Sequence, residues 1–77
     1  MSLVQFIEYF TDLFDETDTD TITASTRFKD LEEWSSLLAL SVIAMIDEEY
    51  DVEFRGDDIR GSNTVEDLYN IVKARVG

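Results

Sequence analysis

The 77-residue sequence contains no cysteine, no histidine and no proline. Without cysteine the chain can form no disulfide, and without cysteine or histidine it cannot build the zinc sites that depend on these ligands. Catalytic arrangements that need a histidine base or a cysteine nucleophile are excluded for the same reason. Only carboxylates and hydroxyls remain as catalytic groups, and nothing in the sequence pairs them, so we expect that the protein is not an enzyme.

Basic residues are also scarce, since six lysines and arginines stand against 18 aspartates and glutamates, a net charge of −12. Such a chain repels nucleic acid and anionic membrane surfaces, so neither is an expected partner. The longest apolar run, residues 42–46, is far shorter than the roughly 20 residues of a spanning helix. The N-terminal segment has no basic region, so we expect no signal peptide, no membrane insertion and a cytoplasmic protein.

Hydrophobic residues are nonetheless frequent enough for a folded core. Leucine, isoleucine, valine and phenylalanine make up 24 of the 77 residues, whereas in disordered chains they usually fall below about 20%. Because the chain is short, we expect one small domain over residues 1–77, and a monomer.

Three stretches show the apolar pattern of long helices. Residues 3–14 repeat hydrophobic side chains every three or four positions, with Ser2 as the expected N-cap. Residues 36–50 are apolar nearly all round, more than so small a domain can bury, so part of this helix is expected to face a partner. Residues 65–76 follow a capping-box pattern that opens at Thr64.

The remaining segments predict a long loop and one short helix. Residues 15–35 begin acidic and threonine-rich, without helical spacing, and we expect Phe28, Leu31 and Trp34 to pin this loop onto the bundle. A single helical turn, bracketed by two glycines, is expected at residues 56–61. Phe54, Ile59 and Leu68 are expected to line the interior.

Acidic residues gather in two places. From Asp18 onward the loop lacks the alternating acids of a calcium-binding loop, because Ile22 interrupts the pattern, so no dedicated metal site is expected. Asp47, Glu48 and Glu53 lie at or beyond the end of the apolar helix, where negative charge is unfavourable for the helix dipole. Because this position costs some stability, we expect these acids to serve a function.

The segment before the apolar helix carries the most informative pattern, Phe28-Lys29-Asp30-Leu31-Glu32-Glu33-Trp34-Ser35-Ser36-Leu37. Further along stand Tyr50-Asp51-Val52-Glu53-Phe54 and Thr64-Val65-Glu66-Asp67-Leu68. In this order and at these separations they resemble the acyl carrier protein and peptidyl carrier protein family. The resemblance implies an all-α fold: a small acyl-carrier-like four-helix bundle of three long helices and one short helix, with a long first loop.

The same resemblance implies a function. In that family a serine in an Asp-Ser-Leu motif receives 4′-phosphopantetheine from coenzyme A, and acyl groups travel as thioesters on this arm. The motif reads Ser35-Ser36-Leu37 here, so Ser36 is the expected attachment residue, at a helix start that suits a phosphate. Two positions depart from the family pattern. Ser35 replaces the usual aspartate, and Asp51 stands where the family often has glycine. Asp51 therefore requires either a left-handed backbone, which aspartate tolerates at some cost, or a local change of turn.

The expected partners are a phosphopantetheinyl transferase and acyl- or aminoacyl-activating and acyl-transferring enzymes with basic docking patches. Leu37, Leu40 and Ala44 are spaced to share one helix face beside Ser36, and that face touches partners in the family. The acids Asp47, Glu48 and Glu53 are expected to steer basic patches onto it.

Two hypotheses follow. The first is a stand-alone acyl or aminoacyl carrier modified on Ser36, with its cargo and pathway left open. The alternative is an unmodified, carrier-like acidic interaction module, and Ser35 is the main argument for it. Each residue also has a simpler interpretation: Ser36 as a mere helix N-cap, Leu40 and Ala44 as ordinary core, and the acids as a solvated face.

Overall fold

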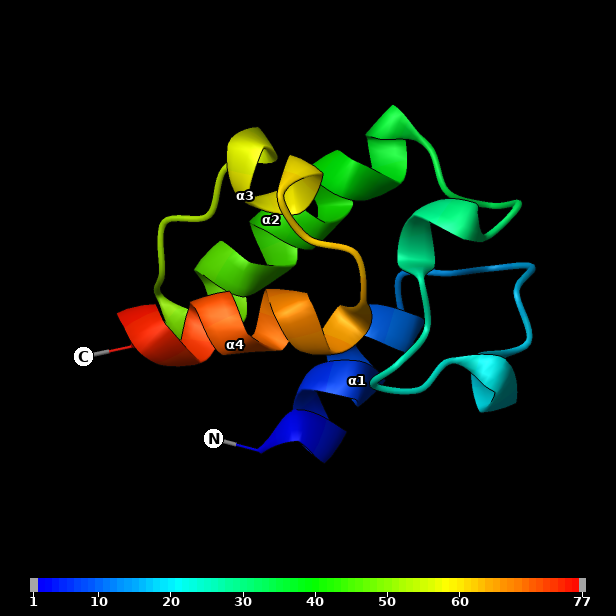
Figure 1. Cartoon of the computed structure of the whole chain (residues 1–77), viewed down its shortest axis with the longest axis horizontal. Helices are drawn as coiled ribbons and strands as arrows, with labels where there is room; N and C mark the ends of the chain where they lie inside the picture. Colours follow the sequence, from blue (N-terminus) through cyan, green and yellow to red (C-terminus); the bar gives the residue numbers. More distant parts are fainter. Residues whose placement is uncertain (1, 77) are drawn as a thin grey trace.

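The computed structural model describes residues 2–76 and shows four α-helices in this range. They are α1 (Leu3–Thr11), α2 (Ser36–Tyr50), α3 (Gly56–Arg60) and α4 (Val65–Arg75), and two 3-10 turns, η1 (Thr19–Thr21) and η2 (Phe28–Asp30), interrupt the first loop. Helix α1 packs on α2 and α4, and the short α3 packs on α2 and α4 (Figure 1). The predicted all-α bundle of three long helices and one short one, with a long first loop, is confirmed.

Capping side chains decide where the long helices begin. The Ser2 hydroxyl accepts a hydrogen bond from the Gln5 amide at 3.1 Å, and Thr64 exchanges hydrogen bonds with Asp67 in a capping box. Both predicted caps are confirmed. Each supplies a partner for amides that lack one inside the helix.

Helix α1 ends earlier than the predicted 3–14 segment. Beyond Thr11 the chain tightens, because the amides of Leu13 and Phe14 bond to carbonyls only three residues back. The apolar pattern nevertheless continues into this turn, and Phe14 is buried. Periodicity therefore predicted which side chains pack, but not where the α-helical hydrogen bonding stops.

The core draws on every helix and on the loops. Its buried hydrophobic members are Phe6, Phe10, Phe14, Ile22, Phe28, Leu38, Val42, Met45, Ile46, Val52, Phe54, Ile59, Val65, Leu68, Tyr69 and Val72. The predicted interior positions Phe54, Ile59 and Leu68 are all among them.

Phe28 fastens the long loop to the bundle. Its ring is fully buried and lies edge-on to Phe10 of α1, with centroids 6.1 Å apart, and to Trp34, at 4.9 Å. Leu31 and Trp34 are partly buried against the same core, so the predicted anchoring of this loop is confirmed. The backbone adds a second attachment, because the first amides of α4 donate to the carbonyls of Thr26 and Ala24.

A single carboxylate, that of Glu33, organises the start of this loop. It accepts hydrogen bonds from the amides of Asp15, Glu16 and Thr17 and from the Thr17 hydroxyl, all between 2.8 and 2.9 Å. These bonds, with that from Asp15 the strongest, lower the pKa of Glu33 from its ordinary 4.5 to about 2. Glu33 thus joins the segment after α1 to the segment before α2.

We predict that Glu33→Gln lowers the melting temperature at neutral pH and that this difference shrinks as the pH falls. A carboxylate whose pKa is depressed by folding stabilises the fold above its unfolded pKa, and the contribution is lost as the pH falls toward about 2. Circular dichroism melts of both proteins between about pH 6 and about pH 2 measure the difference. Glu32→Gln, at an exposed neighbour, is the control. A wild-type advantage that stays constant over this range would contradict the assignment.

Candidate functional site

Two adjacent serines at the start of α2 have different environments. The Ser35 side chain accepts a hydrogen bond from the Leu38 amide at 3.3 Å and is the N-cap. Ser36 is the first helical residue, and its exposed hydroxyl makes no hydrogen bond to residues 2–76. The interpretation of Ser36 as a mere N-cap is therefore wrong, because Ser35 fills that role and leaves the Ser36 hydroxyl accessible.

The helix that follows favours a negative group at this point. Helix α2 has 15 residues, and the amides of its first turn and the positive end of its dipole lie at Ser36. A phosphate attached to the Ser36 oxygen would lie at this end.

A groove of about 580 Å³ opens beside Ser36. The first turns of α2 form one side and α3 forms another. The lining residues are Lys29, Trp34, Ser35, Ser36, Ala39, Leu40, Gly56, Ile59 and Arg60. The Lys29 ammonium donates to the Arg60 carbonyl at 2.9 Å and so links the loop before α2 to the end of α3. Sequence reasoning missed Lys29 and Arg60, which are 31 residues apart and meet only in the folded chain.

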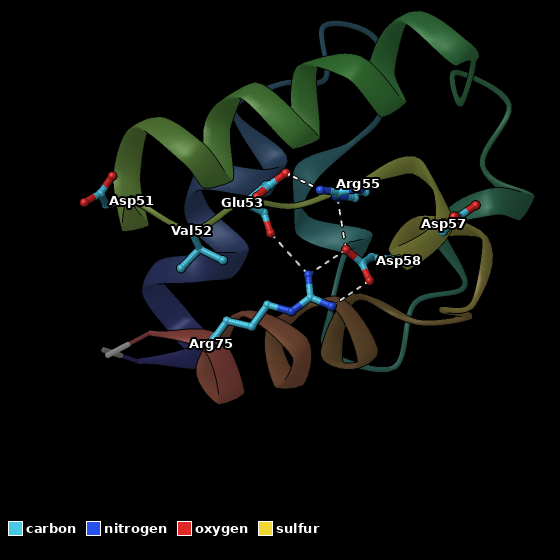
Figure 2. Close-up of a pocket in the computed structure, with 7 residues that line it drawn as sticks. All are labelled: Asp51, Val52, Glu53, Arg55, Asp57, Asp58 and Arg75. Carbon is cyan, nitrogen blue, oxygen red and sulfur yellow. Dashed lines mark hydrogen bonds and ion pairs between the residues drawn. The ribbon is translucent and has the colours of Figure 1, made fainter.

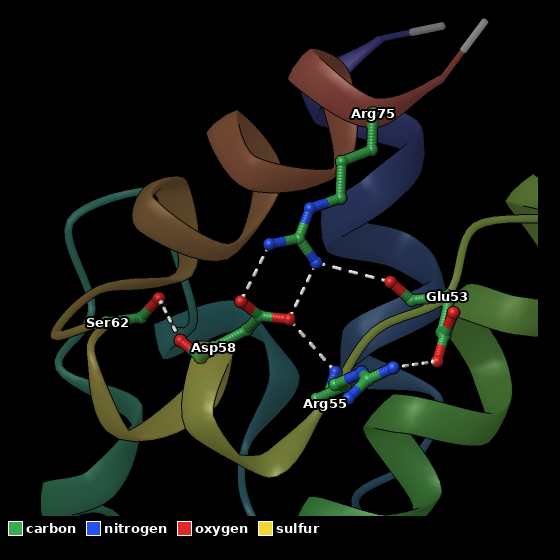
Figure 3. A network of polar contacts seen from close by, with 5 residues as sticks. All are labelled: Glu53, Arg55, Asp58, Ser62 and Arg75. Carbon is green, nitrogen blue, oxygen red and sulfur yellow. Dashed lines mark hydrogen bonds and ion pairs between the residues drawn. The ribbon is translucent and has the colours of Figure 1, made fainter.

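An ion pair holds α3, one side of this groove, in place. Arg75 near the end of α4 donates two parallel hydrogen bonds to the Asp58 carboxylate, at 2.6 and 2.8 Å, and a third to the Glu53 carbonyl (Figures 2 and 3). The Arg55 amide donates to the same carboxylate. Arg75 is the main cause of a lowered Asp58 pKa, and Asp58 in turn raises the Arg75 pKa. The geometry is the bidentate one that arginine and carboxylate favour.

Most of the predicted docking residues lie together on the outer face of α2. Leu37 and Leu40 are 74% and 63% exposed, and Ala44, Asp47 and Glu48 are exposed as well. The alternative of Leu40 and Ala44 as ordinary core is therefore wrong. Two hydrophobic side chains, Leu37 and Leu40, therefore lie in solvent. Ser36 lies beside them at the start of α2, and the acids lie further along the same helix. Their role in docking stays a prediction.

Glu53 has different surroundings from the other five predicted docking residues. It follows α2 on the connection to α3, and its carboxylate pairs with Arg55 at 2.6 Å (Figure 3). Conversely, a groove between α1 and α2 brings Asp12 beside Glu48 and Glu49, and sequence reasoning missed Asp12. The packing of α1 against α2 creates this second acidic neighbourhood.

Asp51 ends α2 in the left-handed conformation, with φ 54° and ψ 45°. It is the one residue with a positive φ in the described range, 2–76. Of the two possibilities for this position, the structure shows the left-handed backbone, which aspartate tolerates better than most residues do.

The all-helical bundle with an accessible serine at the start of α2 defines a small carrier-type domain. A family model described as "phosphopantetheine attachment site" matches residues 4–72, nearly the whole chain. The chain therefore belongs to this family, as its resemblance to carrier proteins implied. Searches of curated proteins and of solved structures gave no match.

Membership of the family establishes the general role. Its members covalently bind 4′-phosphopantetheine, and they are carriers and not catalysts, which confirms the expectations for cofactor and for absence of enzymatic activity. They interact with modifying transferases and biosynthetic enzymes in general. The residues present fit the group, because Ser36 offers an accessible hydroxyl at a helix start. The bound group supplies a thiol, which a chain without cysteine lacks.

Two kinds of feature are absent from the described residues. Within 2–76, no helix has the length and apolar character needed to cross a membrane. No group of three or more acidic side chains in that range is arranged to hold a metal ion.

We predict that the two serines differ in their effect on stability. Ser35→Ala removes the N-cap of α2 and should lower the free energy of unfolding by about 1 kcal/mol. Ser35→Asp should preserve it, because aspartate is an equally good cap and its charge suits the helix dipole. Ser36→Ala is the matched control and should change little. Urea unfolding measures all three, and an equal loss in both alanine variants would contradict the assigned cap.

Proposed function

We propose that the chain forms a single carrier domain that bears 4′-phosphopantetheine on Ser36 and delivers acyl or aminoacyl groups, as thioesters, to partner enzymes. The observation that supports Ser36 most directly is its exposed hydroxyl, which helix capping by Ser35 leaves unused. In the transfer from coenzyme A, the Ser36 oxygen attacks the phosphorus next to pantetheine and forms the new phosphoester bond. The P–O bond that joins this phosphorus to the nucleotide phosphate breaks, the nucleotide leaves as adenosine 3′,5′-bisphosphate, and the hydroxyl proton passes to a base of the transferase or to water.

The N-cap also weakens the main argument for an unmodified module. Ser35 replaces the usual aspartate, but it accepts the same kind of hydrogen bond from the helix amides that an aspartate cap accepts. The start of α2 is therefore capped as it would be by an aspartate. What Ser35 lacks is one negative charge, which bears on how well a basic transferase binds and not on whether the hydroxyl is presented.

The outer face of α2 suits brief contacts with several partners. Leu37 and Leu40 supply apolar contact area beside Ser36, and Asp47 and Glu48 supply charge further along the helix. Charge of one sign on such a surface mainly raises the association rate, so partners are found quickly and are not held for long.

We predict that the protein gains the mass of one phosphopantetheine when incubated with coenzyme A, magnesium and a broad-specificity phosphopantetheinyl transferase. Ser36→Ala should abolish the gain, whereas Ser35→Ala should retain it, because Ser35 serves the helix and not the phosphate. Intact-mass spectrometry reads both. An unchanged wild-type mass, or a gain that survives Ser36→Ala, would refute the proposal. The same measurement on protein from its native cell identifies the cargo as acyl or aminoacyl.

We predict that the double variant Asp47→Lys/Glu48→Lys is loaded about tenfold more slowly than the wild type at low salt, with the difference narrowing as salt screens the charges. Glu66→Lys/Asp20→Lys, with the same charge change on α4 and in the first loop, is the control. Initial loading rates at several salt concentrations provide the measurement. Equal slowing by both double variants would show that net charge matters and the α2 face does not.

A further inference from the structure

Two of the six basic residues lie in the groove that contains Ser36. They are Lys29, from the turn η2, and Arg60, the last residue of α3. In a chain of net charge −12, cations are few, and three of the others form ion pairs with acids outside this groove: Arg27 with Asp30, Arg55 with Glu53, and Arg75 with Asp58. Positive charge is therefore concentrated beside the one serine that the proposed function modifies.

Lys29 keeps most of its capacity to bind an anion. Its ammonium donates to the Arg60 carbonyl, which uses one of its three N–H groups, and it lies 5.8 Å from the centroid of the Phe28 ring. No carboxylate among residues 2–76 forms an ion pair with it. The buried Phe28 and the bond to Arg60 hold this ammonium at the groove.

Arg60 also has donors to spare. Its guanidinium pairs with Asp57 through one nitrogen, and both side chains are largely exposed, so water weakens the pair. A guanidinium carries five N–H donors in a flat fork that matches the oxygens of a phosphate. An anion on the groove side can therefore be bound without breaking the contact to Asp57.

We propose that Lys29 and Arg60 form a phosphate-binding pair that holds the phosphodiester of the prosthetic group against the groove on the α3 side of Ser36. The inference rests on the proposed modification of Ser36. A phosphodiester adds negative charge to a protein already at −12, and this pair, together with the positive end of α2, offsets the repulsion at the point of attachment. Of the predicted docking residues only Leu40 lines the groove, so the bound phosphate would leave most of the outer face of α2 open to partners.

The test compares loaded wild-type protein with the loaded double variant Lys29→Gln/Arg60→Gln. Phosphorus NMR should show a wild-type signal displaced from that of the urea-unfolded loaded protein, and the double variant should lose most of this displacement. Loading should also raise the melting temperature of the wild type by roughly 2–5 °C more than that of the double variant. Because each variant is compared with its own unloaded form, the loss of the Lys29–Arg60 hydrogen bond cancels.

The double variant Arg27→Gln/Lys73→Gln, which removes the same two positive charges at exposed positions outside the groove, is the matched control and should behave as the wild type. The single variant Lys29→Arg should keep the wild-type phosphorus signal, because arginine supplies a cation at the same position. Intact mass distinguishes failure of the proposed function from failure of this inference alone. If the wild type gains no mass, the proposed function and this inference are both wrong. A fully loaded double variant with the wild-type phosphorus signal and the wild-type gain in melting temperature overturns the inference alone.

Discussion

The burial of Phe28 is the contact on which the functional part of this molecule depends. Its ring joins Phe10 of α1 to Trp34, just ahead of α2, and so fixes the end of a loop that spans almost a third of the chain. Lys29 follows Phe28 directly and the serine pair follows Trp34 directly. The positions of Ser36 and of the cation beside its groove therefore depend on one aromatic cluster in the core.

The second constraint is charge. A domain at −12 repels itself, and the structure reduces this repulsion by giving several acids specific partners. Glu33 accepts from loop amides, Asp58 pairs with Arg75, and Asp67 accepts from the two amides just before α4, and each has a lowered pKa. These acids support the fold, whereas acids without such partners on the outer face of α2 are available to meet basic surfaces.

The two serines at the start of α2 have different surroundings. Ser35 satisfies a helix amide, and the Ser36 hydroxyl lies exposed without a competing hydrogen bond. In the proposed function the Ser36 oxygen holds the phosphate, and Ser35 supplies the capping bond that an aspartate would supply. What the substitution of the family's usual aspartate removes is one negative charge next to the proposed attachment residue.

The sequence by itself determined the three long helices, their starts and the apolar excess of α2, because helical spacing and capping act between residues three or four positions apart. Through the family resemblance it also predicted the all-α bundle and Ser36 as the attachment residue, whereas it left the backbone at Asp51 open. It misplaced the end of α1, where tertiary packing keeps Phe14 buried after the α-helical bonding has stopped. Only the tertiary structure brought Lys29 to Arg60, Arg75 to Asp58, and Asp12 to the acidic end of α2. The reason is physical: ion pairs and grooves depend on where side chains meet across helices, and local spacing along the chain carries no record of that.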